Sequence, residues 1–226
     1  MNNTLVFVKR SLNLGKILIG LGVGLAGLGI FVIFALSLLA GSSSAPVFLL
    51  PVSFMSLALL IFTTPVILLY VYDKNNGVLE YLLSLGWNQS DVFKQYLKAA
   101  LFLALLLFTG EAVAILIAGA ISRSMGVFLL DLLMLSLTAF LGFSVVSLVT
   151  MAMMAFSSLQ KQRVGANTPL GLALGAVFIV PTFYLSFIGF IPELIVVLSL
   201  CILAGGLSVG LLLLSSRLIR REKMLP

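Results

Sequence analysis

The chain contains no histidine and only one cysteine, Cys201, in 226 residues. Without histidine there is no Ser-His-Asp triad, no His-Glu-x-x-His zinc site and no histidine proton relay. One cysteine excludes an internal disulfide, and the apolar sequence around Cys201 favours a packing role for it. The sequence therefore predicts neither a catalytic centre of these kinds nor a metal site.

Charged residues are also scarce, at 9% of the chain, whereas hydrophobic residues make up 62% and the mean hydropathy is +1.27. In soluble domains about a quarter of the residues are charged, and a chain of this size has too little interior to hide so much apolar surface. The net charge of +6 comes from the ends of apolar runs, not from a basic patch with interleaved aromatics, so nucleic-acid binding is not expected. The composition is that of an integral membrane protein.

No phosphate-binding loop of the form Gly-x-x-x-x-Gly-Lys-Ser/Thr is present, because the only Gly-Lys pair, Gly15 with Lys16, lacks the upstream glycine. The chain is therefore expected to hold no cofactor and to have no catalytic site of its own. If ATP drives its activity, a second polypeptide must hydrolyse it.

Long apolar runs follow a basic N-terminal segment, and they predict a single all-α transmembrane domain over residues 1–226. Before the first run, Leu5, Val8 and Leu12 recur at helical spacing beside basic residues. This pattern predicts an amphipathic helix in the membrane surface, with a plain positive cap of the first span as the alternative. The six predicted spans cover residues 17–40, 47–72, 90–121, 127–156, 169–188 and 194–216.

The distribution of lysine and arginine predicts the orientation of these spans. With the N-terminus in the cytoplasm, every lysine and arginine except Arg123 lies on the cytoplasmic side. The positive-inside rule therefore predicts that both termini are cytoplasmic. The outer connections are all short, so any large recognition surface is expected in the cytoplasm or inside the membrane.

The longest cytoplasmic connection, within residues 73–98, contains a short apolar segment between charged flanks. Residues 78–85 are apolar except for Glu80 and Ser84. A helix of that length covers about 12 Å, against about 30 Å for the hydrocarbon core of a bilayer. Because it lacks a clean polar face, a helix over residues 77–86 is expected to pack against a partner, either another polypeptide or the chain's own inner rim.

Glu111 is the one acidic residue deep inside a predicted span. An ionised carboxylate there costs on the order of several kcal/mol, and no basic residue in the spans can pair with it. We expect Glu111 to face the bundle, either as a substrate or proton site or as a protonated group bonded across a helix interface. Asp131 and Glu193 lie near the outer ends of spans, where solvation is expected.

Pairs of glycines four residues apart recur in the apolar runs, and this spacing lets helices approach closely. We expect them to serve packing within the chain rather than a specific homodimer contact. The pairs are Gly20 with Gly24, Gly171 with Gly175, and Gly206 with Gly210.

The layout and the sequence of residues 73–98 together resemble the membrane subunit of type-2 ABC transporters, the exporter-type permease family. That family commonly has, after its second span, an acidic turn, Gly-aliphatic-Leu-Glu, a Leu-Leu pair and a polar turn into the third helix. This chain departs at Gly86-Trp87, where a proline-containing turn is usual, and at Gln95, near where Gly-Lys often begins the third helix. The matching elements are Asp73, Gly77-Val78-Leu79-Glu80, Leu82-Leu83 and residues 88–94.

The resemblance implies that residues 77–86 form a coupling helix, which docks on a cytoplasmic ATPase and passes its closure to the spans. It implies that this partner subunit binds ATP and Mg²⁺, and that a second copy or a homologous permease subunit pairs with the chain. It also implies a location in the plasma or inner membrane, among its lipids. The residues implied to contact the ATPase are Gly77, Val78, Leu79, Glu80, Leu82 and Leu83, with the three leucines as the apolar part.

Other readings of the sequence stay open. The compact size is also similar to haem-exporter permeases of cytochrome maturation. A secondary transporter or channel would use Glu111 as its coupling acid and is expected to carry inverted repeats, of which the sequence shows no convincing example. A membrane scaffold regulated by an ATPase without moving substrate is not distinguished from an exporter by the sequence.

Overall fold

The computed structural model describes residues 3–39, 50–122, 125–157, 173, 175–177, 179–181 and 190–218. Nearly all of these residues are helical and none lies in a β-strand, so the predicted all-α class is confirmed for this part of the chain. The helices are α1 (Asn3–Leu14), α2 (Lys16–Leu39), α3 (Leu50–Asn75), α4 (Val78–Ser84), α5 (Gln89–Ser122), α6 (Met125–Ser157) and α8 (Phe190–Leu218).

Membrane-crossing character is confirmed at the level of helix length and composition. Four helices among the described residues are long and apolar enough to cross a bilayer, and α8 carries a shorter apolar stretch. The predicted fifth span, residues 169–188, lies largely outside the described residues, so the number of spans and their orientation stay predictions. The four stretches are Lys16–Ala35, Pro51–Asn75, Ser90–Ala120 and Asp131–Met154.

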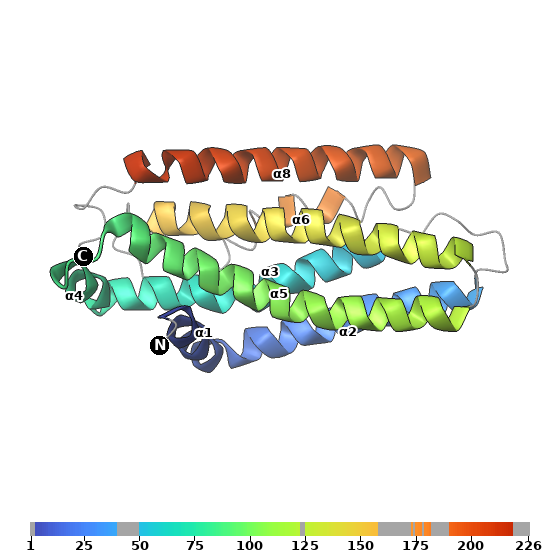
Figure 1. Cartoon of the computed structure of the whole chain (residues 1–226), viewed down its shortest axis with the longest axis horizontal. Helices are drawn as coiled ribbons and strands as arrows, with labels where there is room; N and C mark the ends of the chain where they lie inside the picture. Colours follow the sequence, from blue (N-terminus) through green and yellow to red (C-terminus); the bar gives the residue numbers. More distant parts are fainter. Residues whose placement is uncertain are drawn as a thin grey trace.

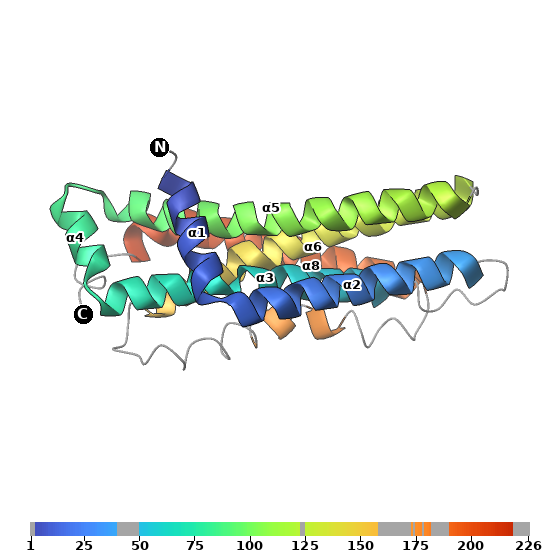
Figure 2. The same cartoon turned by 90° about the horizontal axis from the view of Figure 1, so that it is seen from below.

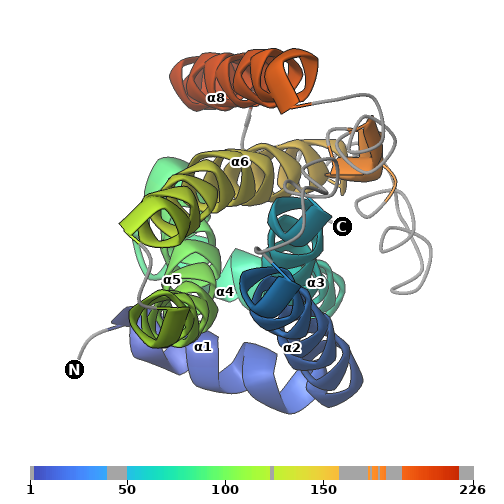
Figure 3. The same ribbon diagram turned by 90° about the vertical axis from the view of Figure 1, so that its right-hand side faces the viewer.

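The long helices run alongside one another, with α3 in contact with α2, α5 and α6 and with α8 on the outer side of α6 (Figures 1 and 3). The helices α3 and α6 run in the same direction, and α5 runs in the opposite one (Figure 1). Along α3, side chains such as Val52, Met55, Leu59 and Val66 are fully buried. The apolar core of the described chain is therefore built around α3.

Helix α1 crosses the long helices toward the end of the bundle where α4 lies (Figure 2), and it packs against α3 and α5. Its buried face consists of Phe7, Val8 and Ser11. Of the predicted stripe, Val8 is buried, Leu12 is partly buried and Leu5 is exposed, and the predicted position of this helix in the membrane surface stays a prediction. A helix seated on other helices presents the face that fits their surface, which the spacing of leucine and valine alone does not specify.

The short connecting helix exists, but the predicted range 77–86 was too long. Helix α4 covers Val78–Ser84, between Gly77 (φ 70°) and Gly86 (φ 85°). A positive φ strains any residue with a Cβ, so glycine is favoured at both positions. After α4, the amides of Gly86 and Trp87 donate to the carbonyls of Leu83 and Leu82, at 3.1 and 3.2 Å, which is a glycine C-cap. Glycine thus supplies the turn that ends α4.

The expected role of the paired glycines was wrong for two of the three pairs. Among the described residues, no heavy atom of a neighbouring element would lie within 4 Å of a Cβ at Gly20, Gly24, Gly206 or Gly210. The close approach of α2 to α3 instead uses Gly22 and Gly29, where an added Cβ would crowd Phe62 and Met55. Gly175 does pack closely, against Leu60, whereas Gly171 lies outside the described residues.

Candidate functional site

Helix α4 is anchored to the chain by one of its faces. Leu79 is fully buried and Leu83 nearly so, and both belong to the core cluster that contains Tyr70 and Tyr96. Leu82 packs partly against the same cluster. The helix contacts both α3, which precedes it, and α5, which follows it. It is therefore fixed to the ends of two long helices rather than suspended in a loop.

The opposite face of α4 carries apolar side chains that the described chain does not cover. Tyr81 is 63% exposed and Leu85, at the C-cap, is 58% exposed. Each follows a buried leucine by two residues, and two residues correspond to about 200° around a helix. These two residues form what we call the outer face of α4.

The structure therefore divides the residues that the sequence singled out for contact with a partner. Leu79 and Leu83 are taken up by the chain's own core, whereas Val78, Glu80 and Leu82 are partly exposed. Gly77 shapes the turn that begins α4. The outer face was not identified from the sequence. The two-residue offset of residues 81 and 85 from residues 79 and 83 places the two pairs on opposite sides of a helix and could have indicated it.

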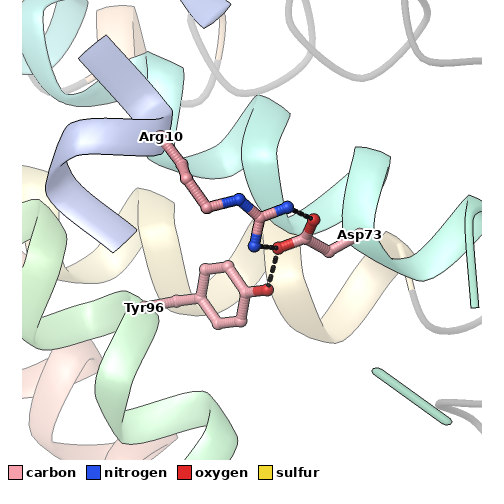
Figure 4. Close-up of polar contacts among 3 residues, drawn as sticks. All are labelled: Arg10, Asp73 and Tyr96. Atoms are coloured by element: carbon pink, nitrogen blue, oxygen red, sulfur yellow. Dashed lines mark hydrogen bonds and ion pairs between the residues drawn. The ribbon is translucent and has the colours of Figure 1, made fainter. Parts of the chain in front are cut away.

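A polar cluster joins α1, α3 and α5 beside α4 (Figure 4). The carboxylate of Asp73, which is fully buried, lies between the guanidinium of Arg10 and the hydroxyl of Tyr96. Arg10 makes two hydrogen bonds to it, from Nη1 to Oδ2 at 3.0 Å and from Nη2 to Oδ1. Tyr96 donates to Oδ2 at 2.6 Å. We call these three residues the clasp.

Two aromatic rings pack against Tyr96 of the clasp, and the Asp73 carboxylate is fully buried. The Tyr96 ring meets Phe7 edge-to-face at 4.8 Å between centroids and meets Tyr70 in the same manner at 5.2 Å. A bidentate arginine pair in such surroundings is strong and directional. The clasp therefore fixes the crossing helix α1 to α3 and α5 at the end of the bundle where α4 lies.

Sequence reasoning missed the clasp as a unit. Asp73 was assigned to an acidic turn, but α3 continues through Asn75, and this extra turn directs the Asp73 carboxylate into the bundle. Arg10 was counted only as a basic residue on the cytoplasmic side, and Tyr96 carried no signal. Separations of 63 and 23 residues between the partners leave no local pattern to detect.

Glu111 faces the interior of the bundle, as expected, and is only 1% exposed. Within the described residues neither carboxyl oxygen has a hydrogen-bond partner, so the bond across a helix interface, one of the two roles considered for Glu111, is not seen there. Asp131 was expected to be solvated, and this was wrong: it is buried, with one oxygen beside Gly119 of α5. The Glu193 side chain lies outside what the structure describes.

No protein family, characterised protein or solved structure is found to match this chain. A possible function must therefore be argued from the outer face of α4, the clasp and the buried polar residues themselves.

Proposed function

We propose that this chain is the permease subunit of an ATP-driven exporter, and that α4 couples it to a separate cytoplasmic ATPase. In this proposal the chain has six spans with both termini in the cytoplasm and has no catalytic site. The ATPase subunit binds ATP and Mg²⁺, and a second permease copy or a homologous permease completes the pathway. The direction of transport follows from the resemblance to exporter-type permeases.

The observation that carries this proposal is the two-faced character of α4. Its inner face is held by Leu79 and Leu83, while the described chain leaves Tyr81 and Leu85 exposed at the end of the bundle. Apolar side chains on a short helix that is too short to cross the membrane are typical of a docking contact. The resemblance of residues 73–98 to the coupling segment of permeases indicates which kind of partner they meet.

The clasp supplies a physical route from this contact to the membrane helices. Asp73 lies two residues before the end of α3, and Tyr96 lies in the early turns of α5, so α4 connects the two helices that the clasp binds together. A displacement of α4 by an ATPase must act on both helix ends at once. Because α1 is bound to the same carboxylate through Arg10, it moves with them or breaks the clasp.

Substitution of the outer face tests the proposal. We expect the double variant Tyr81→Asp/Leu85→Asp to abolish co-purification of an ATP-binding cassette subunit from the native membrane, because two carboxylates would have to be desolvated at the contact. The matched control is Asn76→Asp, which places a negative charge at an exposed position next to α4. That control is expected to retain the ATPase. Retention by both variants, or absence of any ATPase with the wild-type chain, would contradict the proposal.

A second candidate function has one observation in its favour. Glu111 is a buried carboxyl group without a hydrogen-bond partner among the described residues, which suits the coupling acid of a secondary transporter or channel. This candidate assigns no role to the outer face of α4. It would gain support if an ion gradient across vesicles containing the purified chain, without any ATPase, drove transport of the substrate.

A further inference from the structure

Four buried side chains in the long helices have a polar oxygen without a hydrogen-bond partner within the part of the chain that the structure describes, and one of them, Asp131, lies near the start of α6 beside Gly119. The other three are Ser56 of α3, Glu111 of α5 and Thr138 of α6, and none of these three is more than 1% exposed. Buried hydroxyl groups in helices usually bond to a carbonyl one turn earlier, as Thr63 and Thr64 do here. Ser56 and Thr138 are exceptions to this pattern, and they need a physical explanation, as does the carboxyl group of Glu111.

The packing of α3 against α6 places two of these residues at one level of the bundle. A Cβ at Gly142 of α6 would meet the side chain of Leu59 of α3, so these two residues lie opposite each other. The two helices run in the same direction (Figure 1). Ser56 precedes Leu59 by about one turn, and Thr138 precedes Gly142 by about one turn. Ser56 and Thr138 are therefore at the same depth.

The register of α5 brings Glu111 to this level as well. Helix α5 runs opposite to α3 and α6 (Figure 1), and Tyr96 bonds to Asp73 of α3. The residue of α5 at the level of Ser56 lies as far after Tyr96 as Ser56 lies before Asp73 in α3. This position is within two residues of Glu111. The ring contact of Phe108 with Phe143 gives the same result for α6. The residue of α5 that lies as far after Phe108 as Thr138 lies before Phe143 is again within two residues of Glu111.

Glu111 also lies on the side of α5 that faces both neighbours. It follows Phe108, which contacts α6, by about one turn, and it shares the buried side of α5 with Tyr96, which contacts α3. The residues one turn away on either side, Leu107 and Ile115, belong to the two apolar core clusters. The carboxyl group thus points into the bundle, with apolar packing above and below it.

We propose that Ser56, Glu111 and Thr138 form a binding site for the primary ammonium group of an amphipathic ligand. An ammonium group has three N–H donors, and the three side chains offer one acceptor group from each of three helices. One carboxylate balances one positive charge, and at this level no lysine or arginine lies in the described parts of α2, α3, α5, α6 or α8. The adjoining core residues provide apolar contacts for the rest of the ligand.

A metal ion suits this set of groups less well. Calcium and magnesium require six or more oxygen ligands, and the three side chains together offer four oxygen atoms. A divalent ion would also leave an uncompensated positive charge in an apolar interior. No group of three or more histidine, cysteine, aspartate or glutamate side chains able to hold a metal occurs among the described residues.

This inference deepens the proposed function by naming the class of ligand, and it depends on that proposal only for transport and its direction. The binding itself is measured on the chain without an ATPase. A failure to bind amines and a failure to bind an ATPase are therefore separate results.

The test measures, by thermal unfolding in detergent, whether a ligand stabilises the chain. The probes are hexylamine, hexyltrimethylammonium, which has the charge but no N–H donors, and hexanol, which has no charge. We expect hexylamine alone to raise the unfolding temperature in a saturable manner, because a ligand that binds the folded state stabilises it. We expect its apparent affinity to fall about tenfold or more in Glu111→Gln, since a charge-assisted hydrogen bond is lost.

Two conservative variants and two controls complete the experiment. Ser56→Ala and Thr138→Val should each weaken hexylamine binding while the chain stays folded. Thr109→Val and Ser136→Ala should not, because these exposed hydroxyls on α5 and α6 already bond to the carbonyls of Leu106 and Leu133. Equal stabilisation by hexylamine and its trimethyl analogue, or undiminished hexylamine binding in Glu111→Gln, would overturn the proposal.

Discussion

Replacing Asp73 with alanine is expected to release α1 from the bundle and to lower the free energy of unfolding by about 2–3 kcal/mol. The change leaves the buried Tyr96 hydroxyl without an acceptor and the Arg10 guanidinium without its carboxylate. The loss stays below that of a fully buried ion pair because the Arg10 side chain is 38% exposed and remains partly hydrated.

Thermal unfolding in detergent measures this loss, and limited trypsin digestion reports on α1 directly. In Asp73→Ala, cleavage after Lys9 is expected to become several times faster, because α1 no longer packs on α3 and α5. Tyr96→Phe serves as the control, since it keeps the ring contacts with Phe7 and Tyr70 and removes one hydrogen bond of about 1 kcal/mol. Equal effects of the two variants would show that the ion pair with Arg10 does not hold α1.

Replacing Gly15 with alanine is expected to destabilise the chain by about 1–3 kcal/mol, the usual cost of overpacking. Gly15 lies between α1 and α2, and a Cβ there would overlap the ring of Pro65 in α3 and lie 3.3 Å from its Cα. The pyrrolidine ring cannot rotate away as a flexible side chain does. The junction of α1 with α2 must therefore shift outward, which also strains the clasp.

Gly20→Ala is the matched control for this prediction. Gly20 lies in the adjoining helix α2, and a Cβ there would meet nothing within 4 Å in the described part of the chain. Alanine has the higher helix propensity, so this variant is expected to be neutral or more stable by up to about 1 kcal/mol. Thermal unfolding of both variants in one detergent provides the comparison. A Gly15→Ala protein as stable as Gly20→Ala would contradict the close contact with Pro65.

The positions of the long helices could be predicted from the sequence because apolar runs are a direct consequence of the membrane environment. The predicted spans 90–121 and 127–156 fall within two residues of α5 and α6 at each end. The short helix could be predicted as well, since glycine and charged residues bound it. Its length was overestimated because Gly77 and Gly86 form the flanking turns instead of belonging to the helix.

The parts that depend on contacts between distant segments could not be predicted. Spacing alone does not show that Gly22 and Gly29 face α3 while Gly20 and Gly24 face away from it. Likewise, Asp73 looks like a surface acid until the last turn of α3 is known to direct it toward Arg10 and Tyr96. Glu111 stood out because a carboxyl group is rare inside a span, whereas Ser56 and Thr138 gain meaning only from helix register.

The division of α4 into two faces shows the same limit. The sequence identified an apolar helix that needs a partner, and the structure shows that Leu79 and Leu83 find theirs within the chain. The residues left for another polypeptide are therefore Tyr81 and Leu85. Charged substitutions at the outer face therefore test docking alone. Charged substitutions at the inner face would disrupt the core as well as any docking.

Site-specific photocrosslinking tests the docking of α4 most directly. A benzophenone amino acid is placed at position 81 in one protein and, as the matched control, at Phe140 of α6, another exposed aromatic residue at 67% against 63% for Tyr81. After irradiation of the native membrane, we expect an adduct between position 81 and an ATP-binding cassette subunit, and no such adduct from position 140. Adducts from position 81 with lipid alone, or the same products from both positions, would contradict the coupling role of α4.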